Sequence, residues 1–258
     1  MSALSDKLLA LAPREAEPAV LTVDIETSPN IAYVWSLYGE QHISPSQIIE
    51  PSRILSVAAK WRHSRSVLYW SEFHHSREEM IREAWNAYDQ ASVVITYNGR
   101  AFDNKHLQRE WLLAGLGPPS PWVDVDLLQV VRRRFKFPTA KLGYVTEVAG
   151  LPTKLETGGQ QLWNDVLAGD ERAWRKFRDY NKRDVVVTEL LAAYLADWID
   201  VPHMGQWTRD RECCHRCGSV DLTLVGLVYG RTTAYPKLQC DLCGAWNKVL
   251  RNGDTRPV

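Results

Sequence analysis

The sequence has no apolar run of the roughly 18 residues that a membrane-spanning helix requires. Its first residues, M-S-A-L-S-D-K-L-L-A-L-A, lack the basic start and long apolar segment of a signal peptide, and favour a short surface helix with Ser5 as its cap. The chain also has no internal repeat and no low-complexity segment. These absences exclude a membrane protein and a repeat protein, and we expect a cytoplasmic chain.

Cysteine is missing from most of the chain, because all five cysteines lie between Cys213 and Cys243. Such clustering in a chain without an export signal favours metal ligation over disulfides. A charge bias is missing too, since 31 Lys and Arg residues balance 31 Asp and Glu residues. This balance excludes no function, because a nucleic-acid enzyme can gather its acids at metal ions and its bases around them.

Hydrophobic patterns predict an α/β domain. Three strands come in a row, and further strands then alternate with helices, which indicates a mixed five-stranded sheet covered by helices. We expect strands at 21–27, 53–62, 66–72, 92–97 and 122–125, and helices at 76–90, 104–114, 126–135, 142–149, 159–167 and 170–198, the last broken near Tyr180. For residues 28–49 we expect a segment that leaves the sheet, either as an excursion or as a lid. The predicted divisions are an extension over 1–17, the α/β domain over 18–201 and a small module over 207–252.

The segment L-T-V-D-I-E-T, Leu21–Thr27, begins as an apolar strand and ends with two carboxylates. Side chains two apart on a strand point to the same face, so Asp24 and Glu26 lie side by side. Two like charges on one face of a central strand repel each other, and the loss of hydration makes the repulsion worse. The arrangement is tolerated when a divalent cation lies between the two carboxylates. The alternative is a strand end that points both acids into water.

A third carboxylate, Asp103, follows the predicted strand 92–97 in the stretch Y-N-G-R-A-F-D-N-K-H-L. We expect this strand to pair with the first strand, which brings Asp103 to the metal side of the sheet. The alternative is an acid that stabilises only the dipole of the helix that begins there. Asn98 is interpreted as a turn residue, although a hydrogen bond near the site is also open.

The stretch Y-N-K-R-D places Tyr180 and Asp184 on one helix face, because residues four apart share a face. This face continues through Val187, Leu191 and Tyr194. The stripe predicts burial, and a buried carboxylate is costly unless it is paired or bound to metal. Tyr180 can then hydrogen-bond a water held by Asp184. The alternatives are a frayed helix start and a salt bridge to Lys182 or Arg183.

Together the three segments resemble the tyrosine variety of the DnaQ-like 3′→5′ exonuclease superfamily, on the ribonuclease H-like fold. That variety has D-x-E, then an N-x-x-x-F-D-like segment, then Y-x-x-x-D, and the resemblance covers about residues 18–200. The histidine variety needs histidine where this chain has Asp179. The segments D-I-E-T-S-P and K-L-G-Y-V-T-E-V-A-G-L look most like those of polymerase-B proofreading domains and stand-alone bacterial or phage nucleases. No polymerase domain follows, so we expect a stand-alone nuclease.

The resemblance implies two Mg²⁺ or Mn²⁺ ions, held by Asp24, Glu26, Asp103 and Asp184. Asp24 would bridge the ions, and Glu26 and Asp184 would complete the ion that activates water. Asp103 would serve the second ion, and Tyr180 would orient the attacking water. The implied activity is 3′→5′ hydrolysis of single-stranded DNA. RNA trimming and a non-catalytic role in nucleic-acid binding or recruitment are the alternatives.

Two C-x-x-C-G knuckles lie near the C-terminus, with 22 residues between them. Their cysteines are Cys214, Cys217, Cys240 and Cys243. This spacing predicts a tetrahedral Zn²⁺ site, and the stretch between the knuckles reads as a β-hairpin. The module resembles a zinc ribbon, in which the metal stands in for a core too small to fold alone. Redox pairing of the cysteines is the alternative. Cys213 is the odd cysteine, and His215 is predicted to be a surface residue.

Basic residues gather in two places that suit nucleic acid. The run R-R-R-F-K over 132–136 can contact phosphates, or it can simply favour a helix C-terminus. The predicted ribbon combines lysines and arginines with Tyr229, Tyr235 and Trp246. Bases with aromatics suit single-stranded nucleic acid, whereas zinc ribbons also bind proteins. A replication or repair protein therefore stays open as a partner.

Overall fold

The computed structural model describes residues 18–36, 38, 42–153, 155, 158–200 and 212–258. The helix predicted at the N-terminus lies outside these residues. The structure has two compact units, one over residues 19–199 and one that contains the C-terminal residues from 212 onward. No helix in the described ranges has the length and apolar character needed to cross a membrane.

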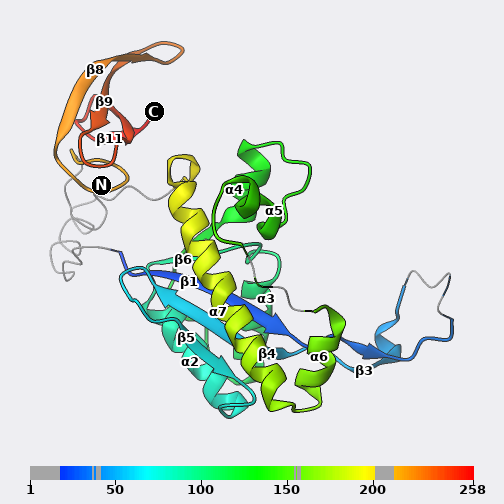
Figure 1. Ribbon diagram of the computed structural model, residues 1–258. Helices are drawn as coiled ribbons and strands as arrows, with labels where there is room; N and C mark the ends of the chain where they lie inside the picture. Colours follow the sequence, from blue (N-terminus) through cyan, green and yellow to red (C-terminus); the bar gives the residue numbers. More distant parts are fainter. Residues whose placement is uncertain (1–17, 37, 39–41, 154, 156–157, 201–211) are drawn as a thin grey trace. The chain divides into compact units, whose positions relative to one another are not determined.

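A mixed five-stranded sheet forms the centre of the first unit, in the order β5-β4-β1-β6-β7 (Figure 1). The strands are β1 (Val20–Thr27), β4 (Ile54–Trp61), β5 (Leu68–Ser71), β6 (Val93–Thr96) and β7 (Val123–Asp126). β1 is central and pairs antiparallel with β4 and parallel with β6. The predicted α/β fold with a mixed five-stranded sheet is therefore confirmed.

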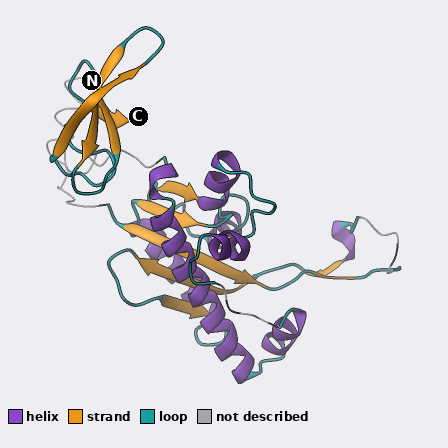
Figure 2. Ribbon diagram, turned by 45° about the horizontal axis from the view of Figure 1, so that its top comes forward, coloured by secondary structure: helices purple, strands orange, loops and turns teal. Residues whose placement is uncertain are grey.

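Helices cover both faces of this sheet (Figures 1 and 2). They are α2 (Arg77–Gln90), α3 (Asp103–Leu113), α4 (Leu127–Arg134), α5 (Leu142–Val148), α6 (Gln160–Leu167) and α7 (Glu171–Tyr194). Apolar residues of β1 pack with α2 and α3 in the main core, as Val23 does with Met80 and Leu107. The opposite face of β1 meets α7, which reaches it through Asn181.

Helix α7 departs from the sequence prediction in two respects. It runs unbroken from Glu171 past Tyr180 to Tyr194, and a 3₁₀ turn at Ala196–Trp198 follows its end. No glycine or proline interrupts the helix, so nothing in its sequence forces a break. Tyr194 was placed on the core stripe but is 59% exposed. At 3.6 residues per turn it lies about 80° around the helix from Asp184.

The predicted excursion after β1 is an arm that leaves the sheet (Figure 1). It contains β2 (Ile31–Ala32), a 3₁₀ turn at Pro45–Gln47 and β3 (Ile48–Glu50), and β2 and β3 pair antiparallel. Ser44 caps the turn, and Gln47 accepts a hydrogen bond from the backbone N–H of Ser44 in return. Large apolar side chains of the arm stay in solvent, including Trp35 at 87% exposure.

The second unit contains a four-stranded antiparallel sheet in the order β11-β10-β9-β8. The strands are β8 (Leu222–Tyr229), β9 (Ala234–Cys240), β10 (Trp246–Val249) and β11 (Thr255–Pro257). β8 and β9 form the hairpin that the sequence predicted. The buried cluster of this unit centres on Cys214, Cys240 and Ala245, so its apolar core is small.

Candidate functional site

Three of the four predicted acids meet where β1 faces α7. Ligand oxygens of Asp24, Glu26 and Asp184 all lie within 4.8 Å of one another. Asp184 is 1% exposed, in the middle of α7. The convergence follows from strand alternation, because Val23 and Ile25 point into the main core and send their polar neighbours to the other face. Three carboxylates this close form an oxygen donor set that suits a hard divalent cation.

Asp103 also lies against β1, but its placement differs from that of the other acids. The ladder between β1 and β6 ends at Thr22, and the backbone N–H of Ile25, beyond it, donates to Asp103 Oδ1 at 3.1 Å. Asp103 is buried in the first turn of α3. The structure thus brings this acid to the strand that carries Asp24, with one carboxylate oxygen bonded to the backbone.

The turn before α3 fixes where Asp103 lies. Asn98 has φ 75°, the left-handed conformation of a turn residue. A Cβ on Gly99 would lie 2.1 Å from Oγ1 of Thr96, so only glycine fits there. Asp126, which belongs to none of the sequence motifs, accepts a hydrogen bond from the backbone N–H of Asn98 at 2.9 Å and also caps α4. This buried carboxylate therefore holds the turn and has a structural role.

Tyr180 lies beside the three acids on the same stretch of α7. Burial raises the pKa of its hydroxyl, and the negative charges of Asp184, Glu26 and Asp24 raise it further. The hydroxyl therefore stays protonated and remains a hydrogen-bond donor. Its ring lies edge-on to Trp163, with centroids 6.4 Å apart.

Asn181 and Ser56 belong to the same cluster, although no motif in the sequence identifies either residue. Asn181 is fully buried, and its Nδ2 donates to Asp24 Oδ2 at 2.7 Å. Ser56 Oγ donates to Asn181 Oδ1 at 2.9 Å. A signal for Asn181 was present, because the buried positions 181, 184, 185 and 188 follow the i, i+3, i+4, i+7 pattern of a core-facing stripe.

A cavity of about 310 Å³ begins directly after the β1 carboxylates. Its lining consists of Thr27, Ser28, Pro29, Gly159, Gln160 and Trp163. Trp163 Nε1 donates to the Thr27 carbonyl at 3.0 Å, so the ring that contacts Tyr180 also forms this wall. None of the clustered acids lines this cavity, but its wall includes Thr27, the residue after Glu26, and Trp163, whose ring contacts Tyr180.

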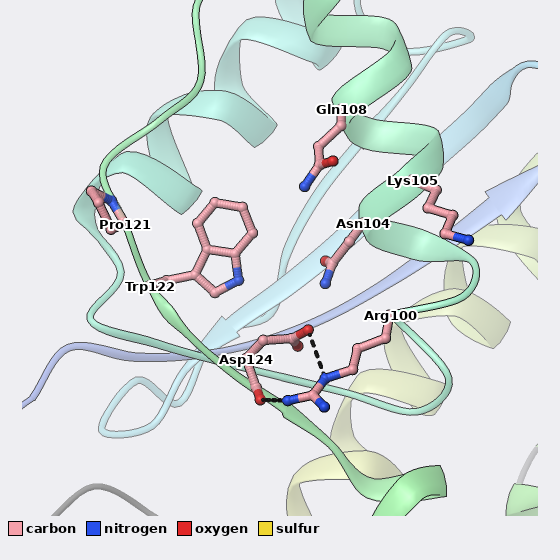
Figure 3. A pocket seen from close by; sticks show the side chains of 7 residues that line it. All are labelled: Arg100, Asn104, Lys105, Gln108, Pro121, Trp122 and Asp124. Atoms are coloured by element: carbon pink, nitrogen blue, oxygen red, sulfur yellow. Dashed lines mark hydrogen bonds and ion pairs between the residues drawn. The ribbon is translucent and has the colours of Figure 1, made fainter.

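A second hollow of about 400 Å³ lies between α3 and the start of β7 (Figure 3). Its lining consists of Arg100, Asn104, Lys105, Gln108, Pro121, Trp122 and Asp124. Arg100 closes one side by donating to the Asp124 carboxylate at 3.1 Å and to its carbonyl at 2.8 Å. Burial raises the pKa of Asp124, and Arg100 opposes that shift. This hollow contains none of the clustered acids.

The four knuckle cysteines form a second cluster, within the C-terminal unit. Their sulfurs lie within 4.8 Å of one another, with Cys214–Cys243 at 3.7 Å and Cys217–Cys240 at 3.6 Å. Four sulfurs at 2.3 Å from a tetrahedral Zn²⁺ would lie about 3.8 Å apart, so the spacing fits zinc. No disulfide joins any of the five cysteines, all of which lie in the described residues, and Cys213 lies outside the cluster.

The prediction that His215 lies on the surface was wrong, because the residue is 8% exposed. Its backbone N–H donates to Asn247 Oδ1 at 2.9 Å, and its ring Nδ1 lies 2.7 Å from the same oxygen. Asn247 Nδ2 in turn lies 3.7 Å from the sulfur of Cys214. His215 is therefore linked through Asn247 to a sulfur of the cluster, and burial lowers the pKa of its ring.

Comparison with known proteins identifies the type of fold. The sequence profile of the RNase_H superfamily matches residues 22–196. A comparison with curated proteins finds no significant match. Among solved structures, the family B DNA polymerase from the hyperthermophilic archaeon Pyrobaculum calidifontis is similar, with a TM-score of 0.54 and 18% identity. The match covers 85% of this chain and 32% of the polymerase chain, and at this identity it shows the fold alone.

Proposed function

The chain belongs to the RNase_H superfamily, and from this premise we propose that it hydrolyses single-stranded DNA from the 3′ end with two divalent cations. The observation that carries the proposal is the cluster of Asp24, Glu26 and Asp184 beside Tyr180, on the fold that the family match shows. The 3′ direction is supported by the Y-x-x-x-D spacing, and the preference for DNA by the resemblance of the D-I-E-T-S-P segment.

The carboxylates have the chemistry that Mg²⁺ or Mn²⁺ needs. Asp24, Glu26 and Asp184 would hold the ions directly, and the oxygen of Asp103 that does not bond Ile25 would serve the second ion through water. Two such ions, when bound, activate a water and stabilise the leaving 3′ oxygen. The clustered acids repel one another without cations, so the charge of the site is neutralised only when divalent cations are bound.

Tyr180 would orient the water that attacks the phosphorus. Its hydroxyl lies on the same helix as Asp184, one turn earlier, so both groups face the cluster together. Trp163 fixes the tyrosine ring from the side and forms the wall of the adjoining cavity. That cavity would receive part of the terminal nucleotide, which keeps the scissile bond next to the acids.

The C-terminal unit would bind Zn²⁺ through Cys214, Cys217, Cys240 and Cys243. We propose that it contacts single-stranded nucleic acid or a replication or repair protein. Exposed apolar side chains on β8, such as Leu224, Leu227 and Tyr229, support a contact surface of this kind. The closed four-ligand site supports a structural role for the zinc.

The test uses end-labelled single-stranded DNA and RNA, each with a free or a blocked 3′ end, with Mg²⁺, Mn²⁺ or chelator. We expect DNA to shorten stepwise from a free 3′ end, and only with a divalent ion. Asp184→Asn should abolish this, whereas Asp179→Asn should not, because Asp179 is an exposed acid on the same helix. Internal cuts, or hydrolysis that persists in Asp184→Asn, would contradict the proposal. Faster shortening of RNA than of DNA would show that RNA is the preferred substrate.

A further inference from the structure

We infer that Asn181 is a positioning residue, which holds the carboxylate of Asp24 in the orientation that a divalent cation requires. The inference rests on the proposed metal site and names a residue outside the predicted ligand set. Asn181 does not offer its own oxygen to the cluster, because Oδ1 already accepts the hydroxyl of Ser56. It acts through Asp24.

The contacts fix the side chain of Asn181 at both ends. Nδ2 donates to Asp24 Oδ2 at 2.7 Å and lies 3.2 Å from the carbonyl oxygen of the same residue. The opposite amide orientation would turn Oδ1 toward the Asp24 carboxylate, and two acceptors would face each other. The Asp24 carboxylate, which only accepts, therefore selects the observed orientation, in which Ser56, fully buried on β4, donates to Oδ1.

An amide is the donor type that suits this position. A lysine or arginine beside Asp24 would neutralise the carboxylate and compete with the metal for it. Asn181 donates a hydrogen bond without adding charge, so the negative potential of the three acids is kept for the cation. The bond engages one lone pair of Oδ2, and a carboxylate has about four lone-pair sites, so this bond does not by itself prevent metal ligation.

The same residue couples three elements that carry the site. Asn181 lies on α7 between Tyr180 and Asp184, Asp24 lies on β1, and Ser56 pairs with Glu26 in the β1–β4 ladder. The two hydrogen bonds therefore set the position of α7 against the strands that carry Asp24 and Glu26. Supporting contacts of this kind are typically worth 10–100-fold in metal affinity or activity.

The test measures Mn²⁺ affinity of the full, zinc-loaded protein by calorimetry, without substrate, with Asp24→Ala to define binding at this site. Asn181→Leu removes both hydrogen bonds at similar side-chain volume, and we expect its Mn²⁺ affinity to fall at least roughly 10-fold. Thr188→Val is the matched control, because Thr188 is a buried polar residue one turn after Asp184, and its affinity should be unchanged. Unchanged affinity in a folded Asn181→Leu protein would overturn the inference.

Ser56→Ala keeps the inference testable if Asn181→Leu does not fold. It removes the hydroxyl that donates to Asn181 Oδ1, and we expect a smaller loss of Mn²⁺ affinity in the same direction. An affinity equal to that of the wild type would then refute the role. If the chain also hydrolyses DNA, the Mg²⁺ concentration for half-maximal rate should rise more than the rate at saturating Mg²⁺ falls. The affinity measurement needs no nuclease activity, so it fails independently of the proposed function.

Discussion

The two candidate metal sites differ in what surrounds them, and the difference indicates what each metal does. The carboxylates lie on one face of a sheet whose other face is packed by α2 and α3 in a large core. The sulfurs are themselves the centre of the small buried cluster of the second unit. A metal bound beside a core that is already complete is not needed for folding and can serve catalysis. A metal at the centre of a small core stabilises the fold.

The two sites also share a feature. A fully buried asparagine donates to a candidate ligand in each, Asn181 to Asp24 and Asn247 toward Cys214. The Oδ1 of each asparagine accepts a hydrogen bond, from the hydroxyl of Ser56 in the first site and from the backbone N–H of His215 in the second. A neutral donor orients a negative ligand without competing for the cation, and this requirement is the same for oxygen and sulfur.

Zinc removal should produce the largest difference between the two units. Cys243→Ser should lose zinc, whose binding is worth about 10–16 kcal/mol in small zinc domains, and the ribbon should lose its order. The α/β unit should keep its structure, because its core does not involve the cysteines. Zinc content and amide NMR dispersion measure both. Cys213→Ser is the matched control and should keep zinc, whereas unfolding of both units in Cys243→Ser would contradict the comparison.

Replacement of Asp24 should have the opposite effect to zinc removal, because it should reduce activity and leave the fold intact. We expect Asp24→Ala to lower the hydrolysis rate by roughly 1,000-fold or more, about 4 kcal/mol in barrier, while both units stay folded. The reason is that Asp24 holds the cations in the proposed mechanism, and its side chain lies outside the main apolar core. Single-turnover rates and circular dichroism test this prediction. Near-normal turnover with Mg²⁺ would remove Asp24 from the mechanism.

Replacement of Tyr180 should have a moderate effect on the same site. Tyr180→Phe keeps the ring contact with Trp163 and removes one hydrogen bond at a charged site, worth about 1.5–3 kcal/mol. The rate should therefore fall roughly 10- to 100-fold and not vanish. Rates at saturating Mg²⁺ provide the measurement, and an unchanged rate would show that the hydroxyl takes no part.

Removal of the ribbon should have the smallest effect on chemistry. A chain that ends at Ile199 retains the whole carboxylate cluster and the core around it. We expect its rate on a short single-stranded substrate to stay within about twofold of the full chain, because no ribbon residue belongs to the carboxylate cluster. A loss of the size seen with Tyr180→Phe would show that the ribbon contributes to catalysis.

The sequence predicted the fold and the acids because alternation and helical periodicity act locally. The pair at Asp24 and Glu26 follows directly from strand geometry, and the buried side of Asp184 from its apolar stripe. Tyr194 was misplaced because an i+4 stripe drifts around the helix over ten residues. Asn181 and Ser56 were missed because their partners come from three distant segments, and His215 because its hydrogen-bond partner, Asn247, lies 32 residues away.

Anomalous diffraction from crystals grown with Mn²⁺ tests the central claim most directly. We predict two Mn²⁺ peaks roughly 3.5–4 Å apart at the cluster of Asp24, Glu26 and Asp184, with Asn181 still bonded to Asp24. The absence of any peak among these three carboxylates at millimolar Mn²⁺ would contradict the account, even if the fold and the zinc ribbon were reproduced in every detail.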